Sequence, residues 1–221
     1  MAAILENDYP TESKTFAKIC GVTYTGALPE YLNRIYAVTE TKWEENVLRL
    51  EKNKSNIKYL MIGEAAPETL SDEVSYFYNN CHGNWCKAIV EGIIPWYQVP
   101  SNIEEKLAEL AKRHFLLVDT MPFALNYSGN NRRGKKAYKE LVGMCANSYF
   151  HKKLFDSRLK WADEVKVAFG VKKNALAMME AFPDGLCLPN GQTVSLSLDL
   201  VATTEANYPH ADRVKSVFEL N

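Results

Sequence analysis

One short run of apolar residues constrains the fold more than any other stretch. Residues 57–62 are mostly apolar and stop at Gly63, and a carboxylate, Glu64, follows at once before Pro67. A run of this length, bounded by Gly and Pro, is typical of a buried strand that ends in a tight turn. Ligands of open α/β sheets bind outside the carboxyl ends of the strands. Glu64 is therefore expected at the mouth of a cleft.

Further apolar runs end in the same way. Residues 115–118 lead into Asp119 and Thr120, residues 164–169 lead into Gly170, and a last strand is expected over 197–203. Amphipathic patterns at helical spacing separate these runs. The alternation predicts the α/β class, as a three-layer sandwich with a mostly parallel central sheet of about four strands.

The helical patterns can be bounded from the sequence. Gly92 is expected to end one helix, and Ser101 with Glu104 predicts a capping box at the start of the next. A chain of 221 residues suits a single domain. Residues 1–29 are expected as an N-terminal extension packed on that domain. The predicted helices cover residues 11–20, 29–53, 85–91, 101–114, 137–148, 149–161 and 172–182.

Composition excludes several classes of protein. Apolar residues make up 47% of the chain and charged residues 24%, as in soluble globular proteins. No apolar run is long enough to span a bilayer, and residues 1–14 lack the pattern of a secretory signal. The five cysteines are scattered, which favours reduced thiols in a cytoplasmic protein. Cys81, His82 and Cys86 lack the spacing of a zinc site. We therefore expect no metal and no cofactor.

Charge leaves the question of nucleic-acid binding open. The net charge of −1 counts against a dedicated duplex-DNA protein, although a local basic patch is enough for binding. The most basic stretch is the turn-rich segment 126–136, which contains Arg132, Arg133, Lys135 and Lys136. Two interpretations remain open for it, a solvated surface loop or a loop that contacts phosphates.

The first strand and its turn resemble the uracil-DNA glycosylase superfamily. Several branches of that superfamily carry a turn of Gly, an acid or amide, any residue, Pro and Gly after the first core strand. An aromatic residue that stacks on a flipped base follows. Here residues 63–67 stand in that place, with one additional alanine, and Phe77 or Tyr78 would be the stacking residue. The resemblance extends in strand order over residues 55–221 and implies the fold of that superfamily.

The resemblance implies catalytic and phosphate-binding roles. Glu64 would act on the attacking water or on the cationic sugar. His210 would donate a hydrogen bond to the departing base, because the family places a His-Pro-Ser turn before its terminal helix and this chain has Pro209 followed by His210. The phosphate-binding residues would be Arg132, Arg133, Lys135 and Arg213.

The base pocket implied by the resemblance lies at the ends of the first two strands. Asp119 and Thr120 match by position the polar residues that help to form it. No C-x-x-C pair is present, so the iron–sulfur cluster of some branches is not expected. The full set of pocket residues would be Gly63, Ala65, Phe77, Tyr78, Asp119 and Thr120.

The predicted function is that of a DNA-base N-glycosylase that removes a flipped uracil or another damaged base from single- or double-stranded DNA. The alternative is a glycosylase-fold protein without that activity, which binds nucleic acid, a nucleotide or a protein partner. A third possibility is an α/β enzyme that acts on another small molecule. The chain lacks the G-x-S-x-G, P-loop and G-x-G-x-x-G motifs, so the commonest enzymes of that kind are unsupported.

Overall fold

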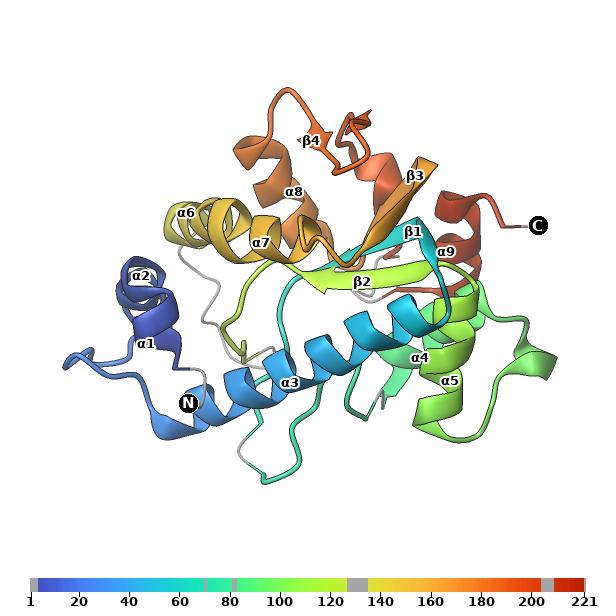
Figure 1. Ribbon diagram of the computed structural model, residues 1–221. Helices are drawn as coiled ribbons and strands as arrows, with labels where there is room; N and C mark the ends of the chain where they lie inside the picture. Colours follow the sequence, from blue (N-terminus) through green and yellow to red (C-terminus); the bar gives the residue numbers. More distant parts are fainter. Residues whose placement is uncertain (1–3, 70, 81–82, 127–134, 204–208, 221) are drawn as a thin grey trace.

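A parallel sheet forms the centre of the protein in the computed structural model (Figure 1), which describes residues 4–69, 71–80, 83–126, 135–203 and 209–220. Strand β1 (Asn56–Gly63) lies between β2 (Phe115–Asp119) and β3 (Lys160–Phe169). Both neighbours run parallel to β1, with Gly63 opposite Asp119 and Ile62 opposite Phe169. The predicted α/β class with a parallel sheet is confirmed.

The expected fourth strand is not formed among the described residues, so the sheet has three strands rather than about four. Val201 makes a single parallel bridge to Phe169, while the residues before it form the short 3-10 helix η3 (Leu198–Leu200). The Ser197 hydroxyl accepts a hydrogen bond from the Asp199 N–H at 3.3 Å and caps this turn. Such local side-chain bonds compete with strand pairing.

Helices flank the sheet on both sides. In the view of Figure 1, α6 (Lys135–Cys145) and α8 (Lys172–Ala181) lie above it, and α3 (Glu30–Lys52) and α5 (Ile103–Lys112) lie below it. The π-helical turn η2 (Ala146–Phe150) and α7 (His151–Leu154) extend α6 without a break. The other elements are α1 (Leu5–Asp8), α2 (Pro10–Cys20), α4 (Gly83–Ile93), η1 (Trp96–Gln98), β4 (Leu186–Cys187), β5 (Thr193–Val194) and α9 (Ala211–Phe218).

Gly92 does not end its helix, contrary to the prediction. Helix α4 continues to Ile93, and a Cβ atom added to Gly92 would lie 2.5 Å from Cβ of Val214 in α9. The missing side chain therefore lets α4 and α9 pack closely. A glycine that permits close approach and a glycine that ends a helix look the same in a sequence.

Two other predicted helix bounds are wrong. The N-cap of α5 is Asn102 rather than Ser101, because the Asn102 side chain accepts the hydrogen bond from the Glu105 N–H at 2.8 Å. The helix predicted over 149–161 stops at Leu154. Lys160 and Trp161 instead pair with the start of β1, so strand pairing with a distant segment decides their conformation.

The N-terminal segment contributes to the core. Leu5 is fully buried, and the ring of Phe16 in α2 stacks on Phe123 with centroids 4.7 Å apart. Phe123 follows β2, so this contact joins the first helices to the segment beyond the sheet. Helices α1 and α2 are thereby packed against the α/β body through apolar surface.

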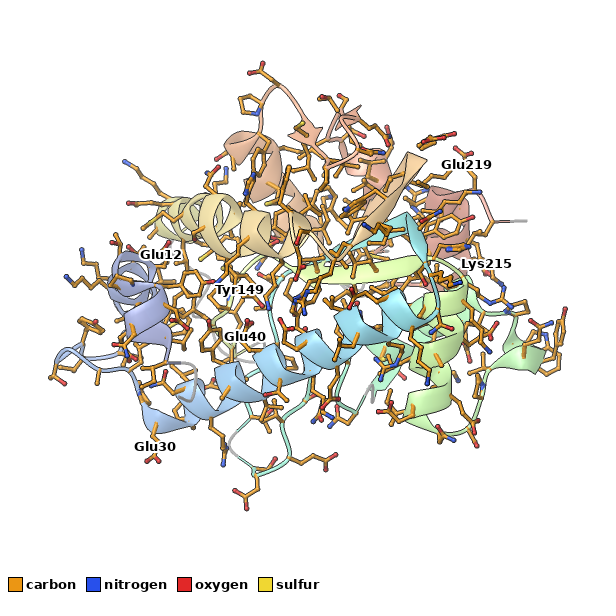
Figure 2. All side chains as sticks on the ribbon, in the orientation of Figure 1. Glu12, Glu30, Glu40, Tyr149, Lys215 and Glu219 are labelled. Carbon is orange, nitrogen blue, oxygen red and sulfur yellow. The ribbon has the colours of Figure 1, made fainter. Side chains whose placement is uncertain are left out.

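An ion pair between the buried Lys153 and the partly buried Glu40 joins α3 to α7. Nζ of Lys153 lies 2.6 Å from Oε2 of Glu40, and 4.8 Å and 5.3 Å from the ring centroids of Trp43 and Tyr149. Figure 2 shows Glu40 and Tyr149 in the space between the two helices. Burial lowers the pKa of Lys153, and Glu40 opposes that shift. Removing the charge of Glu40 would leave Lys153 buried without its partner, which is costly.

The cysteines do not all carry free thiols, contrary to the prediction. Cys86, in the buried face of α4, is disulfide-bonded, whereas Cys20, Cys145 and Cys187 are free. Spacing along the chain does not show which cysteines approach each other in the fold. The cysteine content therefore no longer argues for a reducing compartment. None of the described helices combines the length and the apolar composition that crossing a membrane requires.

Tyr78 closes the outer edge of β2. Its hydroxyl accepts a hydrogen bond from the Leu117 N–H at 2.7 Å and donates one to the Leu117 carbonyl at 2.8 Å. The other edge of β2 pairs with β1. One side chain thus satisfies both backbone groups of a buried strand residue that lack a partner strand.

Tyr78→Phe is therefore expected to destabilise the protein by about 1–3 kcal/mol, because it leaves a buried N–H and a buried carbonyl unsatisfied. Urea denaturation followed by circular dichroism measures the change. Tyr97→Phe is the matched control, since Tyr97 is 70% exposed, and it should leave the midpoint unchanged. Equal midpoints for the two variants would contradict the role assigned to Tyr78.

Candidate functional site

The candidate site is held by backbone pairing that continues past the ends of β1 and β2. The N–H groups of Thr120 and Met121 donate to the carbonyls of Gly63 and Glu64, both at 3.1 Å. Further along, the Leu125 N–H donates to the Ala66 carbonyl at 3.0 Å. The two segments after the strands therefore run side by side, and their side chains are fixed on a rigid backbone.

Glu64 is buried at this edge of the sheet. The residue is 1% exposed, and the Tyr138 hydroxyl of α6 donates a hydrogen bond of 2.5 Å to its Oε1 atom. A carboxylate in such a place needs hydrogen-bond donors, because an ionised group without them is very costly to bury. Tyr138 supplies one and fixes the orientation of the carboxylate.

Asp119 lies beside Gly63 on the neighbouring strand. The two residues are register partners, and a Cβ atom on Gly63 would lie 2.0 Å from Oδ1 of Asp119. The absence of a side chain at Gly63 makes room for this carboxyl group. Burial, and then the negative charge of Glu64, raise the pKa of Asp119 from 3.8 to about 7. Asp119 therefore carries a proton for part of the time near neutral pH.

A hydrogen-bond network joins the ends of β1 and β2 to the first turn of α8. The Thr120 hydroxyl donates to the Gly63 carbonyl at 2.9 Å. Nδ2 of Asn174 donates to the same carbonyl and to the Thr120 hydroxyl oxygen, both at 2.8 Å. Thr120 and Asn174 are fully buried. The start of α8 is thus tied directly to the peptide group that precedes Glu64.

The predicted stacking residues lie in a buried aromatic cluster. Phe77 is 6% exposed and packs edge-on against Trp85, with ring centroids 6.1 Å apart, while the Tyr78 hydroxyl binds β2. Ala65 is also buried. Stacking of either aromatic ring on a base stays a prediction.

His210 and Arg213 lie around the start of α9, where the His210 N–H donates to the Ala202 carbonyl at 3.1 Å and the Ala202 N–H donates to the Phe169 carbonyl at 2.9 Å. The His210 side chain is 59% exposed, and its Nδ1 atom lies 3.9 Å from Oδ2 of Asp212. Arg213 donates to the Val201 carbonyl at 3.1 Å and to the Asp199 carbonyl at 2.9 Å. The structure therefore brings Gly63, Glu64, Asp119 and Thr120 together, and it directs His210 toward solvent.

The predicted basic loop falls largely outside the described residues. Arg132 and Arg133 belong to that part of the chain, and Lys135 is the first residue of α6. Their contact with phosphate stays a prediction. Within the described ranges, no group of three or more His, Cys, Asp or Glu side chains is placed to hold a metal ion.

Sequence reasoning missed Tyr138 and Asn174. Tyr138 sits inside a helix, and nothing in its neighbourhood distinguishes it from a core tyrosine. Asn174 offered a weak signal, because it lies in the first turn of the helix that follows the Gly170 strand end. Polar residues at a helix start usually cap the helix. Here the side chain reaches across to β1 instead.

Comparison with known proteins adds no assignment: no protein-family model, no curated protein and no solved structure matches this chain. The functional interpretation therefore rests on the geometry of the site.

Asp119 should make stability depend on pH. A folded-state pKa above the unfolded value means that the folded protein binds the proton more tightly, so stability falls as the pH rises from about 4 to about 7. For a shift from 3.8 to about 7, the loss is about 4 kcal/mol, at about 1.4 kcal/mol for each unit. Asp119→Asn removes this dependence, because the amide stays neutral.

Urea denaturation of both proteins at pH 5 and pH 8 measures the difference. Titrating groups remote from Asp119 are common to the two proteins and cancel. The Asn variant should therefore gain stability relative to the natural protein between these two pH values. Parallel pH profiles would show that Asp119 has an ordinary pKa.

Proposed function

We propose that the site hydrolyses an N-glycosidic bond and releases a base, uracil or another damaged base, from DNA. The observation that supports this most is the pair of buried carboxyl groups at neighbouring strand ends. Glu64 and Asp119 are 1% and 8% exposed, and the charge of Glu64 contributes to the raised pKa of Asp119. Two carboxyl groups in unequal environments suit one group as base and the other as acid.

The proposed reaction assigns one role to each group. Glu64 accepts a proton from the attacking water and stabilises the positive charge that develops on the sugar. The oxygen of the water bonds to the anomeric carbon as the bond from that carbon to the base breaks. The electron pair of that bond leaves with the base nitrogen, which takes a proton from Asp119. Tyr138 keeps the Glu64 carboxylate in position by its hydrogen bond.

The position of the site agrees with this proposal. Open α/β sheets bind their ligands outside the carboxyl ends of the strands, and both carboxyl groups lie there. Gly63 and Ala65, on either side of Glu64, carry little or no side chain. They therefore offer little steric obstruction to a base that approaches Glu64. An enzyme that acts on a base must take it out of the stack into such a site.

One observation favours the alternative, a glycosylase-fold protein that binds nucleic acid, a nucleotide or a protein without cleavage. Of two residues predicted to assist catalysis and binding, one is exposed and the other binds the backbone. The exposed His210 lies beside Asp212, and Arg213 binds backbone carbonyls. A chain that had lost the reaction could keep the buried carboxyl groups for structural reasons alone.

Cleavage of labelled oligonucleotides that contain uracil, single-stranded and duplex, tests the proposal after alkali treatment of the abasic sites. Glu64→Gln should lower scission by about 10²- to 10⁴-fold, the usual contribution of a general base. The rate of the natural protein should fall above pH 7, as Asp119 loses its proton.

Glu51→Gln is the matched control, since Glu51 is exposed on α3, and it should cleave like the natural protein. Scission that survives unchanged in Glu64→Gln would refute the assigned chemistry. Binding of the oligonucleotide without any scission by the natural protein would favour the alternative function.

A further inference from the structure

Asn174 has one hydrogen-bonding atom that no described residue satisfies. Its nitrogen uses both hydrogens, one on the Gly63 carbonyl and one on the Thr120 hydroxyl oxygen. A carbonyl can only accept, so the nitrogen and not the oxygen of the amide must face Gly63. Oδ1 of Asn174 is buried and accepts no hydrogen bond from any described residue.

A buried acceptor without a donor is costly, and ordered water satisfies most such atoms. Two other buried polar atoms without a partner among the described residues, Oγ of Ser13 and the donor Nδ2 of Asn46, belong to α2 and α3. Asn174 differs from them because its amide is bonded to the peptide group that precedes Glu64. Its free oxygen therefore lies at the ends of the strands, where the proposed reaction needs a water.

We propose that Oδ1 of Asn174 holds the attacking water, together with the carboxylate of Glu64. The assignment rests on the proposed function. A water that donates one hydrogen to the amide oxygen and the other to the carboxylate is oriented, because its lone pairs then point away from both acceptors. Full burial of Asn174 suits a ligand as small as water. Holding a nucleophile in this way lowers the barrier by orientation.

The oxygen of the bound water forms a bond to the anomeric carbon, and the bond from that carbon to the base nitrogen breaks with its electron pair on the nitrogen. One proton of the water passes to Glu64. The other stays on the oxygen, which becomes the new sugar hydroxyl and keeps its hydrogen bond to Asn174. Asp119 supplies the proton that neutralises the base.

Two measurements test the assignment. A high-resolution crystal structure of the natural protein should show a water within hydrogen-bond distance of Oδ1 of Asn174. In single-turnover kinetics with a uracil-containing oligonucleotide, Asn174→Ala should slow cleavage by about 100-fold, a typical cost of lost positioning. The dissociation constant of the oligonucleotide should stay unchanged, because Asn174 contacts the water and not the DNA.

Asn46→Ala is the matched control for lost stability. It truncates another buried asparagine, which belongs to α3 and not to the strand ends, so it should lower thermal stability without the 100-fold loss in rate. No water at Oδ1, an unchanged rate in Asn174→Ala, or an equal loss of rate in Asn46→Ala would overturn the assignment while the natural protein still cleaves. If the natural protein cleaves nothing, the proposed function fails and this assignment fails with it.

Discussion

The parallel pairing of β1 with β2, extended beyond both strand ends, is the interaction on which the rest of the site depends. Backbone hydrogen bonds from Thr120 and Met121 to Gly63 and Glu64 carry the pairing into the segments that follow. Regular pairing normally stops where a strand ends, and loops then diverge. Because these segments stay together, the residues that follow each strand share one edge of the sheet at fixed separation.

This arrangement explains both the burial and the electrostatics of the site. Gly63 opposite Asp119 leaves space for a carboxyl group against the β1 backbone. The same pairing brings that group under the influence of Glu64. Two acidic groups that are both withdrawn from water cannot both ionise easily, so one retains its proton to a higher pH. The raised pKa of Asp119 therefore arises from its position beside Glu64 and not from the chemistry of a carboxyl group.

Much of the framework was predictable because it follows from local patterns. Apolar runs that end in Gly or an acid predicted the three strands, and the spacing of apolar residues predicted α3 and α8 nearly to their ends. Two of the failures share one cause. Gly92 and residues 160–161 take conformations that depend on a partner distant in the sequence, which is Val214 for Gly92 and the start of β1 for residues 160–161.

For the site, the sequence by itself determined which chemical groups stand at the strand ends: Glu64 after the first strand, and Asp119 with Thr120 after the second. It did so because strand ends are marked locally by Gly, Pro and a change from apolar to polar residues. Only the tertiary structure decided that Tyr138 and Asn174 bind this cluster, while His210 points to solvent. Hydrogen bonds across long sequence separations depend on how helices pack on the sheet, and no pattern along the chain encodes that packing directly.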